Sequence, residues 1–544
     1  MGYDIKNDAT AQGGQETETK VNAETTAGTT VTQTLESVTE KTSQNVDSVS
    51  TMGGNMRLRW DNKVEMSSNA HHVLFSSFLK QNGLFDHLVE TAPLEYTSNN
   101  RPDKRNVIGT AVLGILDGAK RFRHFDSLTG DGVSAEVFGL SRLMSCDSVR
   151  RGMLKIDAKK GLLWIWEENL RCLAPVLPED YILDMDPTVK TVYGEQEGAE
   201  VGYNPHKPGH AGLCYHVMSI ATLRMPLGIV VLPGNETAGK DSLPMMETFL
   251  SGVPDSLRPW LVRGDVSFGK DNIIKTCEGF NQHYLFKLGR TKRLKDEWNR
   301  VMGSPESWQS VGDGWQTYDF KFRLSGWDRD RRMVMVRGLD PKQKCDIVQE
   351  ARPEGNAVAI LPGFESIGNR KLPDGYEWYT LVTDLEIPAS DIASLYRQRG
   401  DCENIYDEMK NQWGWSGFNS HKLGCTTILA ALVALVANWW NVFCRLGEDG
   451  SHREATTARP LLQRCVASIT SHAREKTVTL YVASKEATSK VFHEIGLVLA
   501  KIATATQLAP EVRHMVLVRY AFRLYSFKER TFPPIIGNQY TLGL

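Results

Sequence analysis

The chain lacks any pair of cysteines at C-x-x-C spacing. Its nine cysteines are odd in number and scattered through 544 residues, which favours reduced thiols over a disulfide framework. Disulfides are therefore not expected, and the cysteine pattern predicts a cytoplasmic protein.

The chain also has no large excess of charge of either sign, because the formal net charge is only −2. The first 55 residues hold eight acids and three lysines, a charge of −5, which leaves about +3 for the rest. This stretch has few large apolar residues and lacks the apolar core of a signal peptide. We expect residues 1–55 to be a disordered tail, and nothing indicates export.

One apolar run, residues 426–446, is long enough to cross a bilayer. Two asparagines, Asn438 and Asn441, lie inside the run. The run also follows a charged helical segment directly, where a helix packed on a core sheet is expected. We interpret the run as a buried core helix and expect no membrane partner. A membrane span is the less favoured alternative.

The charged segment YRQRGDCENIYDEMK contains Tyr396, Arg399, Glu403 and Lys410. At 3.6 residues per turn, Arg399 and Glu403 are i,i+4 neighbours and Lys410 lies about two turns further on. One helical face would then hold a carboxylate between two cations, an arrangement suited to metal and phosphate. A solvated helix with ordinary ion pairs is the alternative, so other acids must decide.

Aspartates end two upstream apolar runs. In YILDMDPT, residues 181–188, the alternation of a strand places Asp184 and Asp186 on one side. In WLVRGD, residues 260–265, a glycine permits a tight exit before Asp265. Each aspartate taken alone is also compatible with an ordinary turn at a strand end.

The segments around these aspartates suggest a fold. The patterns predict strands over 202–223, 227–232 and 283–289 and a helix over 241–250. With the two aspartate runs included, the order up to Asp265 is β-β-β-α-β, and residues 283–289 follow as a fifth strand. This is the order of a ribonuclease H-like α/β fold with a mixed sheet. Because its first and fourth strands are neighbours, Asp186 and Asp265 are expected to meet, with Glu403 closing the triangle.

The spacing Y-(2)-R-(3)-E-(6)-K resembles the signature of DDE transposases from bacterial insertion sequences, and all four positions match. The segment TVYGEQEGAEVGYNPHKPGHAG, residues 191–212, is similar to one branch of that family. The likeness spans roughly residues 85–480. The family's first aspartate usually stands in a D-x-T setting, which favours Asp186 and leaves Asp184 as a possible metal ligand.

The resemblance implies a metal-dependent site. Its catalytic and metal-binding residues would be Asp186, Asp265 and Glu403. Two Mg²⁺ ions, which Mn²⁺ can replace, suit such oxygen ligands and an in-line displacement at phosphorus. The residues assigned to DNA binding are Tyr396, Arg399, Lys410 and Lys207.

Residues 56–175 carry apolar residues at helical spacing and are expected as a separate helical domain. DNA-end binding is one role for it, and a plain packing module is an equal alternative. Two helices joined by LSRLMSCD are compatible with a helix-turn-helix, with Ser145 as N-cap and Arg150 and Arg151 on the second helix.

The catalytic core is assigned to residues 176–290 and 391–480, a β-rich insertion to 291–390, and a C-terminal region to 481–544. Related transposases carry a β-strand insertion there, and in some a tryptophan stacks on a flipped base. The candidates are Trp308, Trp315 and Trp327, and core packing is the alternative.

The function implied is a cut-and-paste DNA transposase acting on terminal inverted repeats and target DNA. A homodimer is expected in the synaptic complex, because symmetric ends suit a symmetric protein. The protein is expected in a bacterial cytoplasm, associated with the nucleoid. The alternatives are a ribonuclease H-like nuclease without strand transfer and a non-catalytic DNA-binding protein of transposon origin.

Overall fold

The computed structural model describes residues 48–57, 65–178, 180–236, 242–312, 314–339, 376–447, 452–463, 465–473, 475–481 and 487–504, with a few positions beyond. The chain divides into two compact units, Met1–Val64 and Glu65–Leu544. In the first, β1 (Ser48–Thr51) and β2 (Gly54–Arg57) form an antiparallel hairpin. Most of the predicted tail lies outside the described residues.

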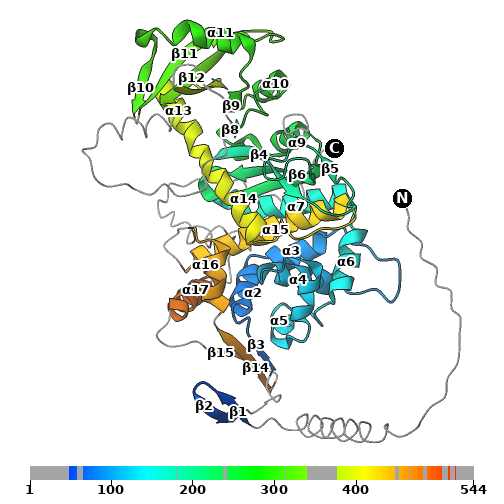
Figure 1. Ribbon diagram of the computed structural model, residues 1–544. Coiled ribbons are helices and arrows are strands. Elements are labelled where there is room, and N and C mark those ends of the chain that lie inside the picture. The colour runs from blue at the N-terminus through cyan, green and yellow to red at the C-terminus, as the bar shows by residue number, and fades with distance from the viewer. Residues whose placement is uncertain are drawn as a thin grey trace, which may run out of the picture. The chain divides into compact units, whose positions relative to one another are not determined.

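The second unit is built around a ten-stranded mixed sheet (Figure 1). Its strands run in the order β10-β11-β12-β13-β9-β8-β4-β6-β5, and β7 also pairs with β6. The strands of the central part are β4 (Ile182–Thr191), β5 (Glu200–Val201), β6 (Ala211–Ile220), β7 (Met225–Pro233), β8 (Leu261–Gly264) and β9 (His283–Leu288).

The central strands have the predicted ribonuclease H-like topology. β4, β6 and β7 form an antiparallel meander, and β8 and β9 run parallel to β4 on its other side. Helix α9 (Leu243–Gly252) precedes β8, and α10 (Asp271–Gly279) connects β8 to β9. The spatial order β7-β6-β4-β8-β9 therefore confirms that the first and fourth strands of the core are neighbours.

The insertion is β-rich, as predicted, but it continues the core sheet instead of forming a sheet of its own. After α11 (Lys292–Val301) come β10 (Gln309–Gly312), β11 (Trp315–Phe322), β12 (Arg331–Leu339) and β13 (Tyr376–Thr383). β13 pairs antiparallel with β9, from Thr380 opposite Leu288 to Thr383 opposite Leu285. Residues 340–375 lie outside the described part.

The predicted N-terminal helical region forms α2 (His71–Gln81), α3 (Leu84–Thr91), α4 (Lys104–Leu116), α5 (Gly132–Val137), α6 (Cys146–Lys155) and α7 (Ala158–Leu173). These helices share one hydrophobic core with the sheet, so they are not the separate body expected from the sequence. The reason is α15 (Leu423–Arg445), which packs against α7, α4 and β7 and is apolar on all sides.

The predicted helix-turn-helix is only partly present. Ser145 caps α6 by accepting a hydrogen bond from the Ser148 backbone N–H, as expected. However, α6 packs against α4 and the 3-10 turn Phe122–Leu128 more than against α5. Arg150 and Arg151 both pair with Asp147 on the same helix.

Within the described residues, α15 is one helix long and apolar enough to span a membrane by length and composition, and 94% of its most apolar window is buried. Its Asn438 Nδ2 donates to Asn169 Oδ1 at 2.8 Å and to the Pro226 carbonyl at 2.7 Å. These hydrogen bonds satisfy a polar group in the core. The structure thus confirms a buried core helix.

The C-terminal part contributes α16 (Ala455–Gln463), β14 (Val466–His472), β15 (Glu475–Tyr481) and α17 (Ala487–Thr504). β14 pairs with β15 and with β3 (Glu65–Ser67) in a second, three-stranded sheet. Residues up to 480 were assigned to the catalytic core from the sequence, whereas this small sheet is separate from the core sheet.

Candidate active site

β4 and β8 bring Asp186 and Asp265 together. Their parallel register ends with Met185 opposite Gly264, so the two aspartates occupy the next position on neighbouring strands, which lie about 4.8 Å apart. At Gly264 a Cβ would lie 2.8 Å from the Phe268 ring, so glycine permits the turn after β8. In that turn the Ser267 backbone N–H donates to Asp265 Oδ1 at 2.9 Å.

Asp186 lies within β4 and not at its end, in contrast to the sequence prediction. β4 continues to Thr191 because β6 pairs with it along its whole length, from Leu183 to Thr191. β8 stops at Gly264. Asp186 therefore lies at the position where β8 no longer pairs with β4 and only β6 does. The edge of β4 that faces Asp265 is unpaired from there on.

The helix predicted over the YREK segment is interrupted. α13 (Ala389–Arg397) ends before a 3-10 turn, Gln398–Gly400, and α14 (Asp401–Asn411) follows. Tyr396 is therefore on α13, Arg399 in the turn, and Glu403 and Lys410 on α14. The four residues do not share one continuous helical face, and Gly400, a poor helix former, lies at the break.

Three side chains tie this segment to β4. Arg399 Nη2 donates to Asp186 Oδ1 in an ion pair. The Tyr406 hydroxyl donates to the Asp186 carbonyl at 3.3 Å, and Lys410 Nζ donates to the Val189 carbonyl at 3.0 Å. Arg399 and α14 are thereby held against the strand that carries the first aspartate.

Asp184 is committed to a buried ion pair. Arg263 Nε and Nη2 donate to its two oxygens at 2.6 and 2.7 Å, and both side chains are almost fully buried. The Cys402 thiol adds a contact at 3.0 Å. Both carboxylate oxygens of Asp184 are thus already engaged, which favours Asp186 as the first acid of the site.

Asp186 lies in an environment that disfavours its charge. Burial raises the pKa of its carboxyl to about 7, the Arg399 guanidinium opposes this, and the Asp265 carboxylate adds to the increase. The side chains of Asp186 and Arg399 are 18% and 19% exposed. Two neighbouring carboxylates in a poorly solvated place call for a cation, and Arg399 supplies one to Asp186.

Glu403 is in the first turn of α14, next to the buried Cys402, and its side chain is exposed. It has no ion-pair partner within the described part of the chain. Among the described residues, one group of three His, Cys, Asp or Glu side chains has ligand atoms within 4.8 Å of one another, and it consists of His71, His72 and Asp117. The oxygens of Asp186, Asp265 and Glu403 are therefore more widely spaced than this.

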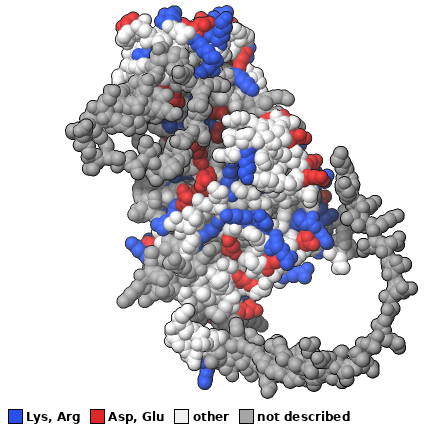
Figure 2. Space-filling view, in the orientation of Figure 1, with Lys and Arg blue, Asp and Glu red and all other residues white. Residues whose placement is uncertain are grey.

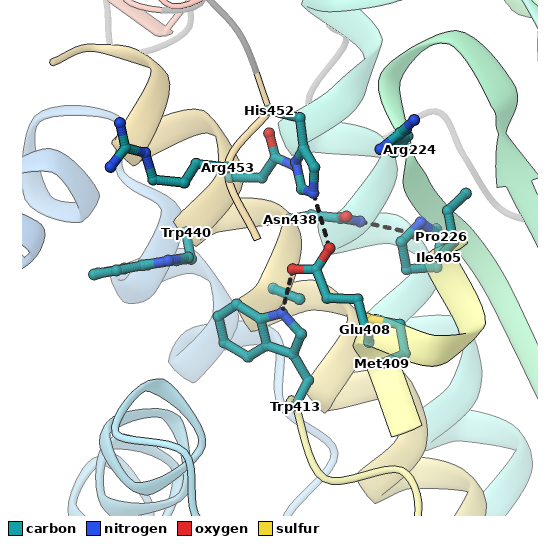
Figure 3. A pocket seen from close by; sticks show the side chains of 12 residues that line it. Arg224, Pro226, Ile405, Glu408, Met409, Trp413, Asn438, Trp440, His452 and Arg453 are labelled. Atoms are coloured by element: carbon teal, nitrogen blue, oxygen red, sulfur yellow. Dashed lines mark hydrogen bonds and ion pairs between the residues drawn. The ribbon is translucent and has the colours of Figure 1, made fainter. Parts of the chain in front are cut away.

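A network of polar side chains around Glu408 holds α14 in place through residues other than those that contact β4 (Figure 3). Glu408 accepts hydrogen bonds from His452 Nε2 at 2.8 Å and Trp413 Nε1 at 3.1 Å. Asn441 Nδ2 contacts His452 Nδ1 at 2.6 Å, and Arg445 donates to Asn441 Oδ1. Sequence reasoning missed this network, because its members are far apart in the chain and match no motif.

Residues 53–504 match the family described as transposase DDE domain group 1. The chain belongs to this family. Among solved structures it is similar to one described as the cryo-EM structure of the piggyBac transposase synaptic complex with hairpin DNA. The identity is 11%, the match covers 84% of this chain and 86% of that chain, and the TM-score is 0.37. No curated protein matches the chain.

The donor set of this DDE transposase fits a divalent cation. Asp186 and Asp265 present hard carboxylate oxygens from adjacent strands, and the Arg399 guanidinium already places positive charge on Asp186. Glu403 stands on the neighbouring helix with a free, exposed carboxylate. These are the three residues that would hold such an ion.

Three of the four residues assigned to DNA binding gather near Asp186. Arg399 contacts Asp186, and Lys410 contacts the strand that carries it. Burial raises the pKa of Tyr396 to about 12, and the charges of Arg399, Asp265 and Asp186 also act on this hydroxyl. Lys207 is instead on the loop between β5 and β6, where its ammonium lies 5.0 Å over the Tyr193 ring. Figure 2 shows basic and acidic side chains interspersed over the described face.

The three candidate tryptophans differ in their surroundings. Trp308 is buried, donates to the Val301 carbonyl at 2.9 Å and packs edge-on against Trp298, so it serves the core of this transposase. Trp315 is partly buried and has the Arg397 guanidinium 5.0 Å from its ring. Trp327, also partly buried, lies 4.7 Å from Arg331.

Proposed function

We propose that the protein is a cut-and-paste DNA transposase that cleaves transposon ends and joins them to target DNA. Hydrolysis would free a 3′ hydroxyl at the element end, which would attack the second strand and later the target. The observation that carries this proposal is the register of β4 and β8, which makes Asp186 and Asp265 neighbours in a member of the DDE transposase family.

Asp186, Asp265 and Glu403 would hold two divalent ions, Mg²⁺ or in its place Mn²⁺. Ions in such a site activate the attacking oxygen and stabilise the leaving oxygen. The exposed Glu403 side chain would turn toward the two aspartates when the ions bind. Arg399, once displaced from Asp186 by a cation, would offer its guanidinium to a phosphate, to which arginine can bind through two hydrogen bonds.

The partner of this site would be double-stranded DNA, both the terminal inverted repeats and the target. A homodimer would hold two ends in the synaptic complex. Lys410 and Tyr396 lie on either side of Arg399 along the chain and would contact the DNA backbone near the cut. The setting we propose is the cytoplasm of a bacterium, in contact with the nucleoid.

The test is a cleavage and strand-transfer assay with DNA that carries the element's own inverted repeats, in Mg²⁺, in Mn²⁺ and in a chelator. Asp265→Ala and Glu403→Ala are expected to abolish excision and to spare end binding. Unchanged excision in either variant would refute the assignment of these residues. Precut ends that are never joined, although uncut DNA is nicked, would indicate a nuclease.

A mobility-shift assay with the same DNA separates the remaining alternative. A protein that binds the ends but neither nicks nor joins them in either metal would be a non-catalytic DNA-binding protein. The matched control is Asp407→Ala, an exposed acid on the same helix as Glu403, which is expected to leave excision unchanged.

A further inference from the structure

A second group of potential metal ligands lies in the helical layer, on elements other than those of the candidate active site. His71 and His72 open α2, and Asp117 is the C-terminal cap of α4. One ligand atom from each lies within 4.8 Å of the others. The two imidazoles are 0% and 1% exposed, and the aspartate is 16% exposed.

The hydrogen bonds around His72 define which nitrogen carries its proton. Ser134 Oγ donates to Asp131 Oδ2 at 2.8 Å, as Ser67 Oγ does at 2.6 Å. With its only proton used, Ser134 Oγ must accept from His72 Nδ1, 2.7 Å away. In a neutral ring the lone pair is then on Nε2, which faces Asp117 Oδ1 at 2.9 Å. A neutral ring would therefore face the carboxylate with two acceptors, so a positive charge belongs here, either a second proton on the ring or a metal ion.

His71 is left without a satisfactory partner. Both of its ring nitrogens are buried and have no hydrogen-bond partner, and neither has Asp117 Oδ2. His71 Nε2 is 3.2 Å from Asp117 Oδ1, close enough to act on the Asp117 carboxyl but short of full hydrogen-bond geometry. Buried polar atoms are normally satisfied, so the two of these atoms that face each other, His71 Nε2 and Asp117 Oδ2, point to a missing ligand.

We propose that His71, His72 and Asp117 form a zinc site that joins the start of α2 to the end of α4. A tetrahedral ion with bonds of about 2.0–2.2 Å has ligand edges of about 3.3–3.6 Å. The distance from Asp117 Oδ1 to His71 Nε2, 3.2 Å, is close to that edge, and the distance to His72 Nε2, 2.9 Å, is shorter, so His72 would move outward when an ion binds. Three protein ligands leave a fourth position for water.

The surroundings of the cluster match those of a bound metal. Two hydrogen bonds in series, from Ser134 to Asp131 and between His72 Nδ1 and Ser134, fix the His72 ring through the nitrogen that would not bind the ion. Outer-shell partners of zinc ligands act in this way. Trp440 packs edge-on against His71 at 5.8 Å. Arg459 brings a positive charge near Asp117, and the Asp117 and Glu408 carboxylates both act on this guanidinium and offset its charge.

The first test uses the wild-type chain, freed of metal by a chelator and titrated with Zn²⁺ and then with Co²⁺. One zinc with histidine ligands is expected per chain, apart from any ion held by the three acids of the active site, with the strong visible bands of tetrahedral Co²⁺ and a higher midpoint temperature of unfolding with Zn²⁺. X-ray absorption at the zinc edge should show two imidazole ligands. A folded chain that takes up neither ion, or zinc without histidine ligands, would overturn the proposal in favour of a buried imidazolium–carboxylate pair.

The second test changes the ligands with little change of shape. Asp117→Asn and His72→Gln are expected to weaken zinc binding by more than tenfold, and Ser134→Ala by about tenfold, in the range known for outer-shell partners. The control is His87→Gln, which breaks a different histidine–carboxylate contact, that of His87 with the buried Glu168 at 2.5 Å, and should leave zinc binding unchanged. Equal binding by Asp117→Asn and wild type would contradict the site.

Discussion

At the scale of single residues, the sequence could predict that Asp186 and Asp265 lie on neighbouring strands, because strand alternation is a local pattern and the order of elements matches a known fold. It could not decide the role of Asp184. That role depends on Arg263, which is 79 residues away and reaches Asp184 through the parallel pairing of β4 and β8. A pattern along the chain shows on which face of a strand a side chain lies, but not which residue of a neighbouring strand it contacts.

Replacing Arg263 by methionine is expected to destabilise the protein by about 3–5 kcal/mol, because the Asp184 carboxylate would stay buried without its partner. Urea unfolding measures the change. The double variant with Asp184→Leu should recover most of the loss, since a buried pair can be replaced by apolar residues. Arg150→Ala, at an exposed ion pair, should change stability by less than about 1 kcal/mol.

Divalent metal binding is expected to depend on pH through Asp186. Burial and the Asp265 carboxylate raise the pKa of Asp186 to about 7, so below pH 7 a proton competes with the ion for this carboxylate. The affinity for Mn²⁺, followed by electron paramagnetic resonance, should rise about tenfold per pH unit up to about 7 and then level off. A constant affinity between pH 5 and 8 would contradict this role of Asp186.

At the scale of elements, the type of most helices and strands in the core followed from periodicity, while the break in the YREK helix did not. The spacing of Arg399, Glu403 and Lys410 suits a continuous helix, but the ion pair of Arg399 with Asp186 and the glycine at 400 coincide with a 3-10 turn. A residue with low helix propensity and a tertiary contact thus act at the same place, and the spacing of the charged residues shows neither.

Glu408 should stabilise α14 in a way that depends on pH. Burial alone would raise the pKa of its carboxyl, but hydrogen bonds from His452, Trp413 and the Ala455 backbone outweigh this and lower it. The contribution is therefore present above the ordinary carboxyl pKa of about 4.3 and is lost as the pH falls through the lower folded value.

We expect Glu408→Gln to cost about 1–3 kcal/mol at pH 7, measured by urea unfolding, and progressively less at low pH. Glu403→Gln is the matched control on the same helix, since Glu403 is exposed, and it should change stability by less than about 0.5 kcal/mol at either pH. A cost for Glu408→Gln that stays constant down to pH 3 would mean that the carboxylate is not the stabilising form.

At the scale of the whole molecule, the sequence could show that the N-terminal helices and residues 426–446 each bury apolar faces, but not that they bury them against each other. Amphipathic spacing identifies a buried face without identifying its partner. The structure places α15 between α7 and α4 and against β7, in one continuous core. The insertion likewise joins the core sheet through β13 and β9.

This shared core predicts one cooperative unfolding transition for the helices and the sheet of the second unit. Far-ultraviolet circular dichroism and tryptophan fluorescence should give the same urea midpoint. Trp440→Ala, which removes a buried ring of α15 that packs on Phe75 of α2, should lower both midpoints together, at a cost of about 3–5 kcal/mol. If the helices formed a separate domain, the two probes would separate in wild type, and the variant would shift only one of two transitions.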